Sequence, residues 1–128
     1  MAEKTVVRTE QAPAPFKGAP YSQAIRAGEL VFVAGQVGVR PGETEAVGST
    51  VEEQTEQTLA NVGAILEAAG SSLDRLVKTT VYLTTLDDFQ GMNEVYRRHA
   101  GDAPPARATV AVGLPAGLLV EIEAIALT

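Results

Sequence analysis

The spacing of apolar residues along the chain predicts eight secondary-structure elements. Short stretches of alternating or continuous apolar residues indicate six strands, and two longer stretches with apolar residues three and four positions apart indicate two helices. The strands fall at 5–9, in a hairpin over 24–39 with a tight turn at 27–29, at 76–84, and as a final pair within 104–128; the helices span 49–70 and 84–101. The predicted order is therefore β-β-β-α-β-α-β-β.

Polar residues mark the ends of both predicted helices. Ser49 or Thr50 can cap the first helix, and each has a Glu three residues later, as in a capping box. Gly70 is expected to follow the last turn of that helix in the left-handed conformation. Thr85 is the expected cap of the second helix, with Asp88 in its first turn near the positive end of the helix dipole.

The predicted topology leaves one face of the sheet without helices. Crossover connections share a hand, so both helices should lie on the same face, and the other face needs water or another subunit. The alternation within 104–128 divides the last two strands into two sets. We assign to the helix face the all-apolar sets, which are Ala108, Val110, Val112, Val120, Ile122, Ala124 and Ala126. The mixed sets, with Arg107, Glu121 and Glu123, then share the free face.

The mixed sets combine charges with sizeable apolar residues. Leu119, Ile125 and Leu127 accompany the charged residues, which predicts a subunit interface containing polar sites. From the pattern alone, the charges form either a structural ion pair across strands or a functional pocket. Arginine can bind a carboxylate through two parallel hydrogen bonds, and a nearby glutamate can hold a water and transfer protons. The pattern permits hydrolysis of a small carboxylate-bearing molecule.

Composition narrows the possible chemistry. The 128 residues, 45% of them hydrophobic, are expected to form one domain over 1–128. The chain has no cysteine and a single histidine, His99, so thiol catalysis and cysteine-ligated zinc are excluded. The net charge of −6 disfavours nucleic acid and anionic membranes as partners. No signal peptide or spanning segment is evident, so a cytoplasmic location is expected. No metal or cofactor is indicated.

Six segments together resemble the RidA/YjgF family, whose members are also known as endoribonuclease L-PSP proteins. They are GAPYSQAI (18–25), VAGQ (33–36), QTLANV (57–62), KTTVYLTTLDDFQGMNEVY (78–96), PARATV (105–110) and VEIEAIA (120–126). The resemblance spans nearly the whole chain in order. It implies an α+β, chorismate-mutase-like fold: a six-stranded mixed sheet with two helices on one face. It also implies a homotrimer with sheets packed inward, clefts between subunits, and a last strand inserted beside VFVAG.

The resemblance also implies an activity. Active members of the family hydrolyse enamines and imines such as 2-aminoacrylate, which pyridoxal-phosphate enzymes form from serine or threonine. The products are a 2-keto acid and ammonia, and no cofactor is needed. Two other functions stay open: a trimer that binds small carboxylates or acts as a chaperone without turnover, and a ribonuclease or translation inhibitor.

Residue by residue, the resemblance implies two catalytic positions and several substrate-binding positions. Arg107 would bind the carboxylate and Glu121 would hold the water. The implied substrate-binding residues are Tyr21, Ala34, Gly35, Asn93, Arg107 and Thr109, the last through its backbone. The chain departs from many members at two places: Ala34 stands where they have serine, and GAPYSQ is one residue longer than their GPYSQ.

Overall fold

All eight predicted elements are present in the computed structural model, which describes residues 3–128. The first two residues of the expected domain lie outside the described part. The strands are β1 (Lys4–Val7), β2 (Ala24–Ala27), β3 (Leu30–Val37), β4 (Leu76–Leu83), β5 (Ala106–Ala111) and β6 (Val120–Leu127); the helices are α1 (Val51–Ala68) and α2 (Phe89–Ala100). No helix in this part of the chain is both long and apolar enough to cross a membrane.

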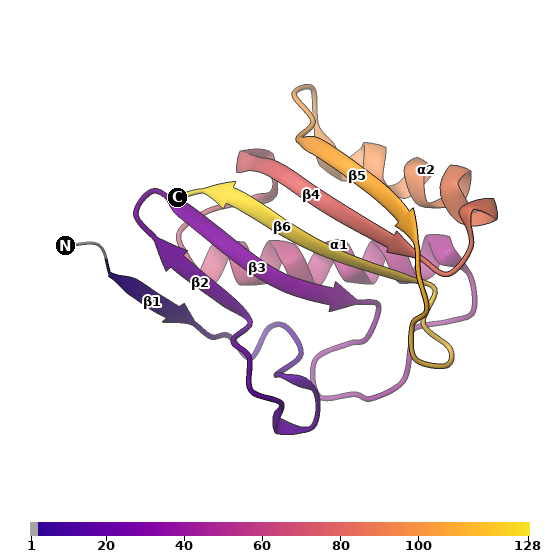
Figure 1. Cartoon of the computed structure of the whole chain (residues 1–128), viewed down its shortest axis with the longest axis horizontal. Coiled ribbons are helices and arrows are strands. Elements are labelled where there is room, and N and C mark those ends of the chain that lie inside the picture. The colour runs from indigo at the N-terminus through magenta and orange to yellow at the C-terminus, as the bar shows by residue number, and fades with distance from the viewer. Residues whose placement is uncertain (1–2) are drawn as a thin grey trace.

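The strands form one mixed sheet in the order β1-β2-β3-β6-β4-β5 (Figure 1). Neighbouring strands are antiparallel except β4 and β5, which run parallel. The last strand lies between β3 and β4, as the resemblance implied. This insertion places Glu121 of β6 beside Val37 of β3 on one side and Tyr82 of β4 on the other.

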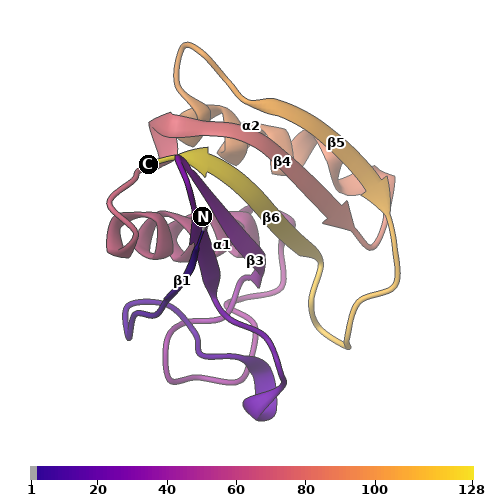
Figure 2. The ribbon, with the colours of Figure 1, turned by 60° about the vertical axis from the view of Figure 1, so that its left-hand side comes forward.

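Both helices lie on the same side of the sheet, as predicted (Figures 1 and 2). Helix α1 contacts β3, β6 and α2. Thr50 caps it, because its hydroxyl accepts the Glu53 N–H at 3.2 Å and the Glu53 carboxylate reaches back to the Thr50 N–H. Gly70 follows the helix with φ +82°, which fits its expected role.

The predicted start of the second helix is wrong in detail. The hydroxyl of Thr85 accepts the N–H of Asp87 and caps a short 3₁₀ turn over Leu86–Asp88, and α2 itself begins at Phe89. The turn also changes the apolar face that the helical spacing predicts for this helix, which is Leu86, Phe89, Met92, Val95 and Tyr96. Met92, Val95 and Tyr96 are buried, whereas Leu86 remains exposed.

The predicted orientation of β5 is also wrong. Arg107 packs on the helix face, where its guanidinium lies against aromatic rings of α2, and Ala108 and Val110 are exposed on the opposite face. The physical reason is that β5 is an edge strand that α2 covers from one side. The aliphatic stem and flat guanidinium of arginine can pack beneath aromatic rings as an apolar residue would. The orientation of β6 is as predicted, with Val120, Ile122, Ala124 and Ala126 buried.

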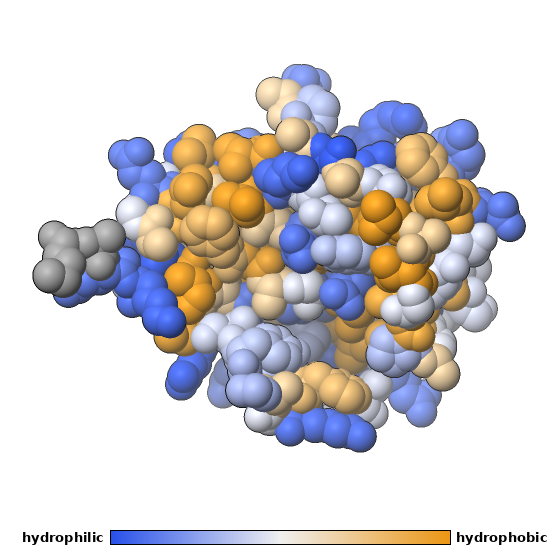
Figure 3. Space-filling model, viewed as in Figure 1, coloured by the Kyte–Doolittle hydropathy of each residue, from blue (hydrophilic) through white to orange (hydrophobic). Residues whose placement is uncertain are grey.

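We call the face of the sheet without helices the open face, and it is partly apolar (Figure 3). Register places Val6, Ile25, Phe32 and Ile125 side by side in one row across four strands. Phe32, near the centre of the row, is 42% exposed. A row of large apolar residues that no helix covers is typical of a surface that another protein chain buries.

A buried glutamine of α1 fixes the loop that leads into β6. The Gln54 side chain is fully buried, donates to the carbonyl of Gly117 at 2.8 Å, and accepts the N–H of Leu119 at 2.8 Å. Leu119 directly precedes β6, the strand that carries Glu121. Gly38 permits this approach, because a Cβ at Gly38 would lie 2.7 Å from the backbone of Gln54.

Replacing this glutamine by leucine should destabilise the protein strongly. The variant Gln54→Leu leaves two backbone groups of the 117–119 loop without partners, at a cost of about 1–3 kcal/mol for each buried group. We therefore expect the free energy of unfolding to fall by about 3 kcal/mol, measured by urea denaturation at fixed protein concentration. Gln57→Leu on the same helix, whose amide bonds only Asn61, is the control. Equal losses in both variants would contradict this account of Gln54.

Candidate functional site

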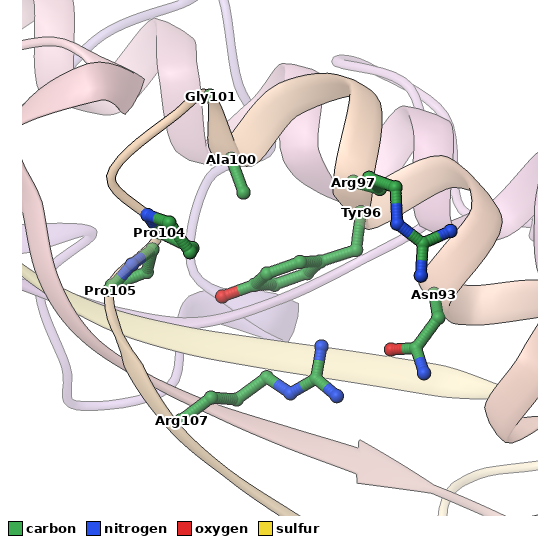
Figure 4. A pocket seen from close by; sticks show the side chains of 8 residues that line it. All are labelled: Asn93, Tyr96, Arg97, Ala100, Gly101, Pro104, Pro105 and Arg107. Atoms are coloured by element: carbon green, nitrogen blue, oxygen red, sulfur yellow. The ribbon is translucent and has the colours of Figure 1, made fainter.

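Arg107 lies on the wall of a hollow between α2 and β5 (Figure 4). The hollow has a volume of about 430 Å³, and its lining residues are Asn93, Tyr96, Arg97, Ala100, Gly101, Pro104, Pro105 and Arg107. The Cζ atom of Arg107 is 4.7 Å from the ring centroid of Tyr96 and 5.5 Å from that of Phe89. None of the ion pairs among residues 3–128 involves Arg107. Its guanidinium can therefore bind an anion from outside this protomer.

Two other predicted site residues, Asn93 and Thr109, lie near Arg107. Asn93 extends from α2 into the hollow, and the guanidinium of Arg107 points toward it in Figure 4. Thr109 lies two residues after Arg107 on β5 and is half-buried on the same face. Arginine, asparagine and a strand backbone together offer hydrogen-bond donors suited to a carboxylate.

The remaining predicted residues lie elsewhere, around β3 and β6. Glu121 is half-buried on the open face, and its carboxylate lies against Gly35 so closely that a Cβ at position 35 would collide with it. Tyr21 and Ala34 line a second hollow of about 500 Å³ together with Phe32 and Glu123. The hydroxyl of Tyr21 accepts the N–H of Phe16 at 2.8 Å, which leaves its own proton free to be donated.

One protomer does not bring the two halves together, contrary to the prediction that Arg107 and Glu121 share the free face. Glu121 projects on the open face, whereas Arg107 projects on the helix face. Strand β4 also separates their strands, so the backbones of β5 and β6 are about 10 Å apart. Each protomer presents one half of the candidate site, with the guanidinium of Arg107, on its helix face and the other half, with the carboxyl group of Glu121, on its open face.

The surroundings of Glu121 raise the pKa of its carboxyl group. Burial, and secondarily the nearby charge of Glu123, raise the pKa of Glu121 above its usual value. Glu123 itself accepts a hydrogen bond from the Tyr82 hydroxyl at 3.0 Å, so its contact within residues 3–128 of the protomer is with β4 and is not an ion pair. A carboxyl group whose pKa lies nearer to neutrality is better suited to transfer protons.

The raised pKa predicts a pH-dependent effect of Glu121→Gln on stability. The folded protein holds the Glu121 proton more tightly than the unfolded chain, so ionisation costs stability as the pH rises through the folded-state pKa. We expect Glu121→Gln to raise the Tm of the protein at pH 7 but much less at pH 4. Thermal melts across this range, with Glu67→Gln on the exposed surface of α1 as control, measure the effect. A Tm difference that does not depend on pH would contradict the assignment.

Some residues of the site were absent from the sequence prediction. Tyr96 and Phe89 were identified only as apolar positions of the second helix, yet their rings hold the guanidinium of Arg107. The pattern carried no signal for this role. His99, by contrast, contacts Glu56 of α1 at 2.9 Å and does not line the hollow. In residues 3–128, no three His, Asp or Glu side chains are grouped so that they could hold a metal ion.

Comparison with known proteins gives consistent matches over nearly the whole chain. The family model described as Endoribonuclease L-PSP matches residues 9–128. A RutC family protein of Pyrococcus horikoshii is 51% identical over 124 residues, covering 96% of this chain and 97% of that protein. The 2-iminobutanoate/2-iminopropanoate deaminase of Mus musculus is 43% identical, covering 96% and 90%. The crystal structure of E. coli TdcF with bound serine superimposes with a TM-score of 0.88 at 38% identity, covering 97% and 98%.

Proposed function

Because the chain belongs to the endoribonuclease L-PSP (RidA/YjgF) family, we propose that it is a cofactor-independent imine deaminase. Its substrates would be 2-iminopropanoate, 2-iminobutanoate and their enamine tautomers such as 2-aminoacrylate, which pyridoxal-phosphate enzymes release. Water adds to the C=N carbon, the C–N bond breaks, and a 2-keto acid and ammonia leave. The observation that carries the proposal is the guanidinium of Arg107, which lines a hollow and has no acidic partner among residues 3–128.

In this reaction Arg107 and Glu121 would have different roles, substrate binding and proton transfer. Arg107 would bind the substrate carboxylate through two parallel hydrogen bonds, with Asn93 and the backbone of Thr109 adding further contacts. Glu121 would take a proton from the attacking water and deliver it to the departing nitrogen. Gly35 leaves room for the Glu121 carboxyl, and Tyr21 can donate its hydroxyl proton to the substrate. The imine already reacts with water, so positioning and proton transfer supply what the reaction needs.

A complete site would then require two copies of the chain. The two halves lie on opposite faces of one protomer, and the open face carries an uncovered apolar row. We propose a homotrimer in which the open faces pack inward and Glu121 of one copy faces Arg107 of the next. The closed ring has three equivalent heterologous interfaces, so it forms three sites.

The experiment that tests this function generates 2-aminoacrylate in the cuvette. A serine dehydratase produces the intermediate, and keto-acid formation is followed with and without the protein. We expect the protein to accelerate formation clearly above the uncatalysed rate. An intact oligomer that accelerates hydrolysis of no imine, tested over several side-chain sizes, would overturn the proposal in favour of a small-carboxylate-binding protein.

The features of the chain do not favour a ribonuclease. The only histidine, His99, is engaged with Glu56 outside the hollow, and the net charge of −6 repels a phosphate backbone. An RNA substrate incubated with the same preparation should therefore remain intact.

A further inference from the structure

Aromatic rings, rather than an acidic side chain, hold the guanidinium of Arg107. The Tyr96 and Phe89 rings lie 4.7 and 5.5 Å from its Cζ atom, and the sulfur of Met92 lies 4.0 Å from Nη1. Rings attract a cation through their faces without accepting its hydrogen bonds in the plane of the guanidinium. Apart from the Nη1–H that the Met92 sulfur accepts, the N–H groups of Arg107 therefore stay available to a ligand, provided that the rings themselves are fixed.

The Tyr96 ring is fixed at both of its ends. Its backbone belongs to α2, and its hydroxyl lies 2.7 Å from Oγ1 of Thr79 on β4. Tyr96 is 6% exposed and Thr79 is 1% exposed, so water does not compete for this hydrogen bond. A phenylalanine at position 96 would fill the same space but would lack the second anchor.

The register of the sheet connects this anchor to Arg107. Thr79 is the neighbour of Arg107 across the parallel pair β4 and β5. The hydroxyl of Tyr96 therefore ends beside the strand position from which the arginine projects, and its ring extends over the arginine side chain, as Figure 4 shows. A hydrogen bond from α2 to β4 thus sets the position of a ring above a residue of β5.

We infer that Thr79 and Tyr96 are positioning residues, which hold the guanidinium of Arg107 in the orientation that binds a substrate carboxylate. Neither residue needs to touch the substrate. The inference rests on the proposed function only in taking Arg107 as the carboxylate anchor. It assigns the pair a role in binding the carboxylate of the substrate rather than in proton transfer.

The test separates this role from a merely structural one through two variants, one conservative variant that keeps the hydroxyl, and a matched control. Thr79→Val and Tyr96→Phe each remove one partner of the hydrogen bond and conserve volume. Thr79→Ser keeps the hydroxyl and should restore the wild-type behaviour. Thr58→Val removes another fully buried hydroxyl, one that bonds the carbonyl of Gln54 on α1, and controls for lost stability alone.

Two readouts are used on the intact oligomer. The first is the Nε–H resonance of Arg107 in protein labelled with ¹⁵N-arginine, assigned by its disappearance in Arg107→Lys. The second is the Kd of pyruvate, a 2-keto acid product, measured by calorimetry. We expect Thr79→Val and Tyr96→Phe to move the resonance and to raise the Kd about five- to tenfold, the size of one lost hydrogen bond. In both variants the KM for the imine substrate should rise by a similar factor over wild type, and kcat should change less.

The outcomes distinguish this inference from the proposed function. An unchanged resonance and Kd in both variants, or changes matched by Thr58→Val, would overturn the inference even if the wild type is an active deaminase. If the wild type accelerates hydrolysis of no imine, the proposed function fails, and the resonance and the Kd of pyruvate then decide whether the pair positions Arg107.

Discussion

Arg107→Lys is expected to lower kcat/KM for 2-iminopropanoate about 100-fold, because a lysine cannot form the two parallel hydrogen bonds of a guanidinium. Hydrogen bonds to charged groups contribute about 1.5–3 kcal/mol each, and a loss of about 3 kcal/mol corresponds to two decades in rate. The substitution also removes the flat group that packs against Tyr96 and Phe89. Arg107→Ala should lose at least as much. The assay is keto-acid formation from imine generated in the cuvette.

The control for this prediction is a second arginine. Arg98 lies on the exposed side of α2, 4.0 Å from the Glu56 carboxylate, and Arg98→Lys preserves its charge outside the hollow. We expect its kcat/KM to stay within about twofold of wild type, since an exposed ion pair contributes little. If Arg107→Lys retained wild-type activity, carboxylate binding by Arg107 would be wrong.

Phe32→Asp is expected to convert the oligomer to monomers and to abolish deaminase activity. Phe32 lies in the apolar row of the open face, flanked by Ile25 and Ile125 in the register of the sheet. A carboxylate buried at an interface without a partner is strongly unfavourable. The fold of the protomer should persist, because Phe32 is 42% exposed there and contributes little to the core.

Size-exclusion chromatography with light scattering measures the assembly, and circular dichroism measures the fold. Ala60→Asp, which adds the same charge to the exposed side of α1, is the control and should remain oligomeric and active. A Phe32→Asp variant that stays oligomeric would show that the open face is not the interface. A monomer with full activity would show that the site is complete within one chain.

The order and type of the elements could be predicted because their signals are local. The capping box at Thr50 marks the start of α1, and Gly70 marks its end. In β6, the side chains of Val120 and Ile122 are buried under the helices, whereas Glu121 projects on the open face. The orientation of β5 could not be predicted from alternation. Ala108 and Val110 looked like core residues, but the strand lies at the edge of the sheet, where a packed arginine takes the covered side.

The residues of the candidate site could be proposed from the sequence, but their arrangement in space could not. The pattern and the resemblance identified Arg107 and Glu121, since charges within apolar strands are conspicuous. Arg107 and Glu121 lie on opposite faces because the side chain of Arg107 in β5 points to the helix face, and β4 lies between the two strands that carry them. The contact of Tyr96 with Thr79 joins a helix to a strand 17 residues away in the chain, which no local pattern encodes.

Mixed oligomers test most directly whether Arg107 and Glu121 act together across two copies of the chain. Arg107→Ala and Glu121→Gln chains, each expected to be inactive alone, are unfolded together in equal amounts and refolded. If each site takes its arginine from one copy and its glutamate from the next, about one quarter of the sites contain both native residues. The mixture should then recover about a quarter of the wild-type deaminase rate, whereas a rate no higher than that of the separate variants would contradict the account.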